Sequence, residues 1–266
     1  MERGEKGINY IDTARGYTVS EEFLGYALEG LRDKFILATK SMSRTKDAMA
    51  GDIDISLNNL KTDYIDLYQI HNPTPEQLEQ VVAPGGALEA LTEAKATGKI
   101  GHIGVTCHTV AIFEKAIQYD WVETIMFPYN IVETQGEALI RKCAEKNIGF
   151  IAMKPLAGGA IDDANLALRF ICANPDVTVV IPGMAAESEV EQNIASVTNC
   201  APLSEAELAG MEKIRSFLGT QFCRRCNYCA PCTVGINIPA VFLFEGYYSR
   251  YNLKEWATNR YNQLSS

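Results

Sequence analysis

The sequence predicts an α/β fold, a (β/α)₈ TIM barrel, from its short apolar strands, the helical periodicity between them and the regularity of the repeat. Seven runs rich in apolar and β-branched residues alternate with segments of helical spacing. Runs such as 150–153 are wholly apolar, as expected for strands covered on both faces. The strands are expected at residues 8–14, 34–40, 64–71, 102–107, 124–130, 149–155 and 177–183.

The repeat length and the strand count refine this prediction. The strand ends recur about every 30 residues, the size of a βα unit with a right-handed crossover. A closed barrel has eight strands, and residues 5–7 have the character of a helix end, so the barrel is expected to lack its first strand. An open doubly wound sheet is the competing fold, but the first βα turn has no G-x-G-x-x-G motif. We therefore expect a barrel over residues 1–218 and a helical, cysteine-rich extension over residues 219–266.

Local signals place two of the helices. Thr18 and Glu21 have the spacing of a capping box, and so do Ser204 and Glu207 near the end of the barrel. Each pair predicts a helix start. The apolar face of the first of these helices is expected to consist of Phe23, Leu24, Ala27, Leu28 and Leu31.

Composition narrows the class of protein. Hydrophobic residues make up 47% and charged residues 21%, the balance of a soluble globular protein. The net charge of −9 argues against a nucleic-acid partner, and no run approaches the ~18 apolar residues of a membrane span. A core of this size needs no disulfides, so the eight cysteines favour a reducing cytoplasm. Cys107, Cys143, Cys172 and Cys200 are expected to be small core residues.

Four titratable side chains follow the ends of the first three predicted strands. They are Asp12, Tyr17, Lys40 and His71. Each alone has an ordinary structural interpretation as a cap, a packing residue or a solvated charge. In a barrel, however, the C-terminal ends of the strands surround one mouth, and burying four such groups there unpaired would be costly.

Together these residues can deliver a proton during reduction of a carbonyl. A phenol with a pKa of about 10 is a poor acid–base catalyst at neutral pH. A cation at Lys40 is expected to lower the pKa of Tyr17, and Asp12 to hold that cation in place. His71 is expected to orient the carbonyl or to help relay the proton.

The motifs around these residues resemble those of aldo/keto reductases. The similar segments are 12–14 with Tyr17, 38–40, 69–71, 103–105, 128–130, 154–156 and 181–183, and the resemblance covers about residues 7–218. It implies a (β/α)₈ oxidoreductase that transfers a hydride between NAD(P)H and a small carbonyl or alcohol. The family's catalytic tetrad would be Asp12, Tyr17, Lys40 and His71.

The resemblance also implies where a nicotinamide dinucleotide would bind. The residues concerned are Thr106, His108, Tyr129, Lys154, Pro155, Leu156, Gly158, Gly183, Met184, Gln192 and Asn193. Thr106 and His108 would lie near the carboxamide, and the glycine-rich segment 154–159, ahead of a helix near Asp162, near the pyrophosphate. Segment 184–193 has three glutamates and no basic residue. Carboxylates would repel a 2′-phosphate, so NAD(H) is expected over NADP(H).

The extension carries a thiol at every third position. The four are Cys223, Cys226, Cys229 and Cys232. This spacing favours a [4Fe-4S] cluster, with zinc as the alternative and local disulfides less expected. Segment 223–239 resembles the tail of a ferredoxin-type branch of the aldo/keto reductases, which implies electron exchange with a carrier. In that branch a second cysteine run is expected downstream, and none occurs before Ser266.

Two other functions are consistent with these features. One is a redox-sensing or electron-transfer module that binds nucleotide with little turnover. The other is an incomplete fragment of a longer reductase. The sequence carries no signal for the substrate's identity or for the oligomeric state.

Overall fold

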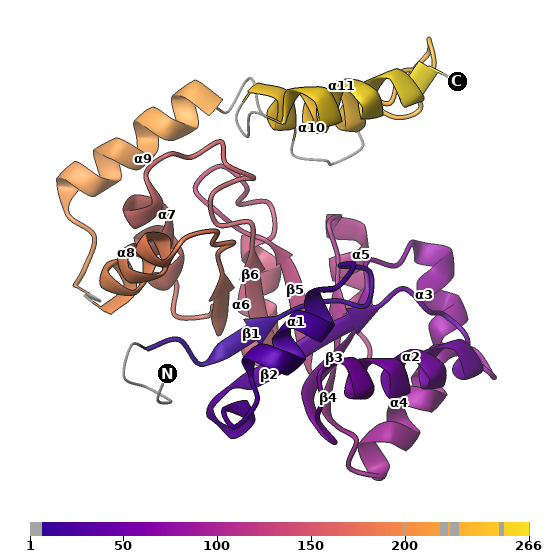
Figure 1. The fold of residues 1–266 in the computed structure, drawn as a ribbon. Helices are drawn as coiled ribbons and strands as arrows, with labels where there is room; N and C mark the ends of the chain where they lie inside the picture. Colours follow the sequence, from indigo (N-terminus) through magenta and orange to yellow (C-terminus); the bar gives the residue numbers. More distant parts are fainter. Residues whose placement is uncertain (1–6, 199–200, 219–222, 224–228, 250–252, 266) are drawn as a thin grey trace. The chain divides into compact units, whose positions relative to one another are not determined.

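The computed structural model describes residues 7–198, 201–218, 223, 229–249 and 253–265. In this part of the chain, seven strands form one sheet in the order β1-β2-β3-β4-β5-β6-β7 (Figure 1). The four ladders from β1 to β5 are parallel. The strands are β1 Tyr10–Asp12, β2 Ile36–Ser41, β3 Ile65–His71, β4 Ile100–Thr106, β5 Thr124–Pro128, β6 Gly149–Met153 and β7 Val179–Ile181. All seven overlap the predicted segments.

Helices connect successive strands, as a (β/α) barrel requires. The connecting helices are α1 Ser20–Ala27, α2 Lys46–Asn59, α3 Pro75–Val82, α4 Ala87–Ala96, α5 Val110–Ala116, α6 Glu137–Glu145 and α7 Ala164–Cys172. After β7 come α8 Glu187–Thr198, α9 Glu205–Leu218, α10 Ile238–Ser249 and α11 Lys254–Asn262. Short 3₁₀ turns cover Arg32–Lys34 and Gln263–Ser265. No helix in the described residues is long and apolar enough to cross a membrane.

The chain divides into two compact units. The first comprises residues up to Phe127 with Ala138–Ile151 and Asp176–Ile181, and the second the remainder. In the first unit, Phe113 packs its ring against Phe127 and Phe150 at centroid distances of 5.2 and 5.8 Å. The second unit has its own core, formed by Ile131, Val132, Ala157, Ile161, Leu166, Ala167, Met211 and Leu218. All four predicted catalytic residues belong to the first unit.

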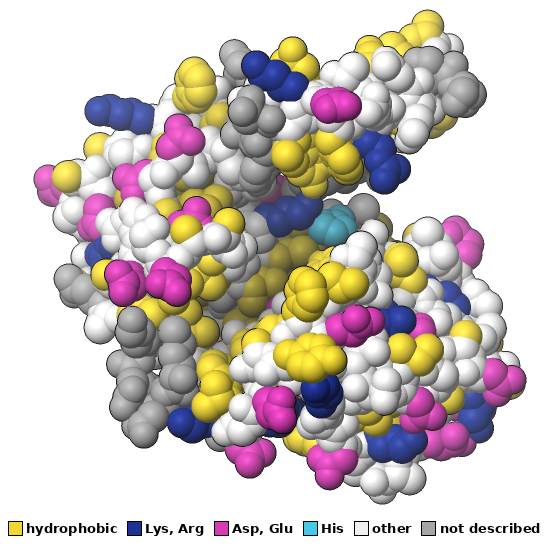
Figure 2. Space-filling view, viewed as in Figure 1, with side chains coloured by type: hydrophobic (Ala, Val, Ile, Leu, Met, Phe, Trp, Pro, Cys, Tyr) yellow, Lys and Arg dark blue, Asp and Glu magenta, His cyan; other side chains and the backbone are white. Residues whose placement is uncertain are grey.

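Helix α1 begins and packs differently from the prediction. Its N-cap residue is Val19, without a side-chain cap, and its buried residues are Glu21 and Gly25. Phe23 is 68% exposed, and hydrophobic side chains lie on the surface over α1 in Figure 2. Gly25 explains the difference, because a Cβ there would lie 2.1 Å from the carbonyl oxygen of Asn59. The backbone of α1 thus approaches the end of α2 through a small, polar face.

The other predicted capping box is confirmed. The backbone N–H of Ser204 donates to Glu207 Oε2 (2.7 Å), and the N–H of Glu207 donates to Ser204 Oγ (3.3 Å), immediately before α9. The Glu207 carboxylate also pairs with Arg169 of α7, so the capping box and a tertiary ion pair share one carboxylate.

The cysteines divide into core and surface groups. Cys107 and Cys143 are buried, as predicted, whereas Cys172 is exposed. The prediction for Cys172 is therefore wrong, because the last turn of α7 leaves it on the surface. Cys200 lies outside the described residues.

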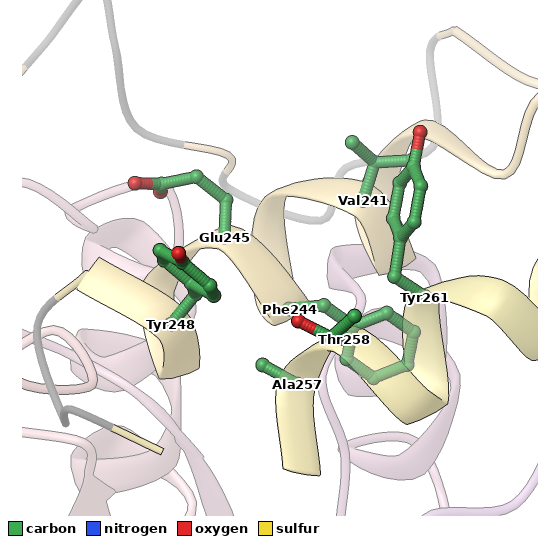
Figure 3. A pocket seen from close by; sticks show the side chains of 7 residues that line it. All are labelled: Val241, Phe244, Glu245, Tyr248, Ala257, Thr258 and Tyr261. Atoms are coloured by element: carbon green, nitrogen blue, oxygen red, sulfur yellow. The ribbon is translucent and has the colours of Figure 1, made fainter. Parts of the chain in front are cut away.

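The extension contains two helices, α10 and α11. A cavity of about 210 Å³ between them is lined by Val241, Phe244, Glu245, Tyr248, Ala257, Thr258 and Tyr261 (Figure 3). None of the residues predicted for catalysis or for cofactor binding is among these. We therefore assign the cavity to the packing of the two helices.

Candidate active site

The predicted catalytic residues meet at the C-terminal ends of β1, β2 and β3. Lys40 Nζ donates to Asp12 Oδ2 (2.5 Å) and to the carbonyl oxygen of Thr13 (2.8 Å). The register explains this meeting, since Asp12 pairs with Ala38 and Lys40 lies two residues further along the same face of β2. The side chain of Lys40 is only 2% exposed, so its charge is neutralised inside the protein.

The two aromatic members lie around this ion pair. Lys40 Nζ is 4.8 Å from the centroid of the Tyr17 ring, and the rings of Tyr17 and His71 meet edge to face at 6.0 Å. Tyr17 is 46% exposed, so its phenol is accessible to a bound molecule. The structure thus brings together the carboxylate, ammonium, phenol and imidazole that the strand ends predicted.

Burial controls the pKa values in this group. It raises the pKa of Asp12 and lowers that of Lys40, and in each case the partner's charge opposes the effect. Partial burial, reinforced by the charge of Asp12, also raises the pKa of Tyr17. The predicted lowering of the Tyr17 pKa by Lys40 is therefore absent from this structure, and the phenol stays in its acid form at neutral pH.

His71 is held in a neutral state and in a fixed position. Burial and then the charges of Lys40 and Arg44 lower the pKa of His71 to about 4. Arg44 Nη2 also donates to the carbonyl oxygen of His71 (2.7 Å). The next residue, Asn72, has a positive φ of 45°, and its N–H donates to Thr106 Oγ1 (3.0 Å). These contacts clamp the turn that carries the imidazole.

Two polar side-chain atoms at the site are buried without a hydrogen-bond partner. His71 Nδ1 and Gln69 Oε1 have no hydrogen-bond partner among the described residues. Gln69 Nε2 lies 3.5 Å from Asp12 Oδ1, so this amide is directed at the ion pair. Buried polar groups without a partner are costly, and both of these atoms are enclosed by the protein.

Of the predicted carboxamide neighbours, Thr106 ends β4 and is buried. Its hydroxyl accepts from Asn72, which leaves one hydroxyl proton to donate. His108 follows in the same unit and is half-buried. This arrangement fits a carboxamide oxygen near Thr106.

The other predicted nucleotide residues lie in the second unit. Tyr129 is 1% exposed, with its ring 5.3 Å from that of Phe170 and its hydroxyl bonded to Glu137 and Asn174. It thus offers no open ring face to a nucleotide. Gly183, Met184 and Gln192 are exposed, Pro155 and Asn193 are buried, and Lys154, Leu156 and Gly158 are half-buried.

The glycine-rich segment is an irregular turn and does not lead directly into a helix. Lys154, Ala157, Gly158 and Gly159 all have positive φ values. The carbonyl oxygen of Lys154 accepts from Asn130 Nδ2 (2.9 Å). The next helix, α7, starts at Ala164, and its N-terminus is capped by Asp163, whose carboxylate accepts from Leu166 N. The Asp163 carboxylate therefore occupies that helix end, and the contact of segment 154–159 with a pyrophosphate stays a prediction.

A similar contact occurs at the start of α8. Glu189 Oε2 accepts hydrogen bonds from the N–H groups of Ala185 (2.6 Å) and Ala186 (3.2 Å). A carboxylate thus fills a position at which backbone N–H groups would otherwise attract an anion.

In the extension, three of the predicted metal ligands are described. Cys229 is exposed, whereas Cys223 and Cys232 are half-buried. Cys226 lies outside the described residues. Hydrogen bonds from the backbone of Val234, Ile236 and Gly235 lower the pKa of the Cys232 thiol. Such N–H donors favour a thiolate, which is the form that binds a metal or a cluster.

Some functional contacts were not predicted. The sequence motifs contain Gln69 and the pair Thr39–Glu21, but they do not show that Arg44 holds His71 or that Glu21 bonds to Thr39 Oγ1 (2.8 Å). The contact of Thr39 could have been anticipated from strand alternation, because Thr39 and Lys40 must point to opposite faces of β2.

The chain is similar to known proteins in both sequence and structure. The model of the aldo/keto reductase family matches residues 4–166, which is more than half of the chain. The chain therefore belongs to the aldo/keto reductase family, and it is an oxidoreductase of that type, as its motifs predicted.

Relatives match well beyond the shared motifs. An uncharacterized oxidoreductase, YqkF of Bacillus subtilis, is 26% identical over 78% of this chain and 83% of its own length. L-galactose dehydrogenase of Arabidopsis thaliana is 28% identical over 78% of this chain and 77% of its own length. Among solved structures, aldo-keto reductase AKR11C1 from Bacillus halodurans has a TM-score of 0.69 at 26% identity, covering 79% of this chain and 83% of that one.

A further solved structure contains a nucleotide. An aldo-keto reductase from Klebsiella pneumoniae in complex with NADPH has a TM-score of 0.67 at 27% identity, covering 79% of this chain and 81% of that one. These likenesses confirm a barrel-type fold with seven strands in the described residues of this chain.

The charge state of His71 gives a pH prediction. The chain has three histidines, so a His71→Asn variant identifies the His71 imidazole signal in an NMR titration. We expect a midpoint of about 4. Because this value is below that of an unfolded histidine, the free energy of unfolding falls as the pH drops from about 6.5 toward 4. Arg44→Met should raise the midpoint, whereas Arg32→Met should leave it unchanged. A wild-type midpoint near 6.5 would contradict the described environment.

Proposed function

We propose that the chain transfers a hydride between a nicotinamide dinucleotide and a small carbonyl or alcohol, with Asp12, Tyr17, Lys40 and His71 as its catalytic residues. The observation that supports this proposal is the convergence of these four groups around a buried ion pair. The bound nucleotide would supply the hydride, and the protein's side chains would supply the proton and orient the carbonyl. We place this chemistry in residues 1–218 and in the cytoplasm, where thiols stay reduced.

Tyr17 is the proposed proton donor. Its phenol is protonated at neutral pH, as a proton donor must be, and because burial raises its pKa, release of the proton depends on a nearby cation. When the phenol releases its proton to the carbonyl oxygen, Lys40 lies close enough to stabilise the phenolate. Asp12 keeps the ammonium in place through the 2.5 Å hydrogen bond. In the reverse direction the same phenolate would accept the proton of an alcohol.

His71 is proposed to orient the substrate. With a pKa of about 4, its imidazole is neutral at physiological pH and can donate one hydrogen bond to a carbonyl oxygen without adding a charge. The edge-to-face contact of its ring with that of Tyr17, at 6.0 Å, supports this role. A neutral donor leaves Tyr17 as the group that transfers the proton.

The second unit and the end of β4 are proposed to bind the nucleotide. Thr106 has a hydroxyl proton available for the carboxamide, and His108 lies two residues beyond it. On the family resemblance, Lys154, Pro155, Leu156, Gly158, Gly183, Met184, Gln192 and Asn193 complete the site, with Tyr129 as its least supported member.

We further propose that NAD(H) is preferred. The Klebsiella relative was solved with NADPH, but in this chain the Glu189 carboxylate accepts the N–H groups at the start of α8. A second anion, the 2′-phosphate, would be repelled there.

The extension, residues 219–266, is proposed to bind a [4Fe-4S] cluster through Cys223, Cys226, Cys229 and Cys232, and to exchange electrons with a carrier. The N–H groups directed at Cys232 support the thiolate form that a cluster needs. Zinc bound by the same thiols is the alternative ligand.

Replacing Tyr17 tests the proposed reaction. Tyr17→Phe should lower kcat for reduction of 4-nitrobenzaldehyde by NADH or NADPH by about 100-fold or more, because general acid catalysis contributes about 10²–10⁴-fold. Nucleotide binding, measured by protein fluorescence, should be unchanged. Tyr26→Phe is the control, since Tyr26 is an exposed residue of α1. Equal turnover by the Tyr17→Phe variant and the wild type would exclude Tyr17 as the donor.

Nucleotide preference is tested by paired titrations. NADH should bind more tightly than NADPH, and Glu189→Gln should tighten NADPH binding by about five-fold, because one screened charge is worth about 1 kcal/mol at 4 Å. Glu205→Gln, at the exposed start of α9, is the control and should change neither affinity. The preference for NAD(H) is wrong if the wild type binds NADPH as tightly as NADH.

Metal and sulfide analysis tests the cysteine cluster. Protein purified without oxygen should contain about four iron and four sulfide per chain, with a broad visible absorbance that bleaches on reduction. Cys229→Ser should lower the iron content, whereas Cys172→Ser, an exposed thiol on α7, should not. Zinc alone would make the extension a structural site, and absence of both metals would refute the proposed role of the four thiols.

A further inference from the structure

A buried carboxylate lies behind the strand that carries Lys40. Glu21, in the first turn of α1, is 2% exposed. Its oxygens accept from Arg15 Nη1 (2.7 Å) in the loop after β1, and from Thr39 Oγ1 (2.8 Å) in β2. They also accept from Ser56 Oγ (2.8 Å) and Asn59 Nδ2 (3.4 Å) of α2. One side chain therefore ties together three successive segments of the chain.

The contact with Thr39 acts on Lys40 through the backbone. Adjacent residues of a strand point to opposite faces. Lys40 bonds to Asp12 on one face of β2, and Thr39 bonds to Glu21 on the other. Because the peptide between the two residues is planar and rigid, fixing the Thr39 side chain also restricts the direction of the Lys40 side chain.

The contact with Arg15 acts on Tyr17. The backbone N–H of Arg15 donates to the carbonyl oxygen of Lys40 (3.0 Å), and the N–H of Tyr17 donates to that of Ala14 (3.0 Å). The guanidinium of Arg15 pairs with Glu21. The loop is thus fixed at both its backbone and its side chain two residues before the phenol.

The position of α1 makes these contacts feasible. Gly25 lies one turn after Glu21 on the same face, and its lack of a Cβ lets α1 approach the carbonyl oxygen of Asn59. A bulkier residue would separate α1 from α2 and take the carboxylate away from Ser56. The small face of α1 therefore serves to deliver Glu21 to the back of β2.

We propose that Glu21 is a positioning residue of the active site, whose carboxylate fixes Lys40 and Tyr17 relative to one another through Thr39 and Arg15. The inference rests on the proposed function, in which those two residues act together. Glu21 contacts neither member directly in the described structure. Its effect follows from the hydrogen bonds it accepts, because a buried carboxylate is retained only where donors satisfy it.

Thr39 provides the mildest kinetic test. Thr39→Val removes the hydroxyl and keeps the shape, and it should lower kcat for 4-nitrobenzaldehyde by about ten-fold, less than the about 100-fold that a 1 Å misplacement can cost. The KM for NADH should change little. Thr39→Ser restores a hydroxyl and should recover most of kcat. Equal kcat values in the Val and Ser variants would overturn the link through Thr39.

A titration of Tyr17 tests the same inference without turnover. The absorbance at 295 nm of each protein is compared with that of its Tyr17→Phe counterpart, which isolates one phenol. In Glu21→Gln, the loosened loop should expose Tyr17 to water, so its raised pKa should fall toward that of free tyrosine. An unchanged Tyr17 titration in Glu21→Gln would overturn the inference.

Asp66→Asn is the matched control. Asp66 Oδ2 also accepts from an arginine, Arg32 Nη2 (2.6 Å), and from β2, at Leu37 N (2.9 Å), but near the start of that strand. The Asp66→Asn variant should have a lower melting temperature, but its kcat and its Tyr17 titration should keep wild-type values. If Asp66→Asn shifts the titration as much as Glu21→Gln does, the effect is general destabilisation and the inference fails. If Tyr17→Phe turns over normally, the proposed reaction fails, and the titration still decides the role of Glu21.

Discussion

Lys40 carries an ammonium into the interior, where an unpaired charge would be strongly unfavourable. Asp12 of the neighbouring strand stabilises this charge, because the parallel register of β1 and β2 brings the carboxylate beside the ammonium. Lys40 also donates to the Thr13 carbonyl oxygen, and the Gln69 amide donates to Asp12. The geometry at the ends of the first three strands depends on this interaction, since Tyr17 and His71 are both arranged around it.

Burial and the same charges together set the protonation states of the neighbouring groups. Burial, and then the cations of Lys40 and Arg44, lower the pKa of His71, while burial, and then the anion of Asp12, raise the pKa of Tyr17. The two aromatic groups therefore keep a neutral imidazole and a neutral phenol over a wide range of pH. A neutral hydrogen-bond donor beside an intact proton donor is the combination that reduction of a carbonyl needs.

The sequence was sufficient where the signal is local. Apolar runs and their spacing predicted seven strands, and polar residues at strand ends predicted which four side chains would meet. It was insufficient where contacts join distant segments. Glu21 has the spacing of a capping residue, but its partners Ser56 and Asn59 lie 35 and 38 residues away, and a tertiary contact outweighed the local one. The exposure of Phe23 has the same origin, because Gly25 directs the other face of α1 inward.

Strand β2 has a polar contact on each face, with Lys40 bonded on one and Thr39 on the other. The supports of the proton-donating pair therefore come from α1 and α2, on the side of the sheet away from Asp12. For protein engineering this arrangement is useful, because residues that shape a substrate can be exchanged on one side while the supports on the other are kept. A library that varies the loops after β4 to β7, and keeps the loop after β1, the turn after β3 and the α1–α2 contact constant, would explore new substrates on a constant acid–base framework.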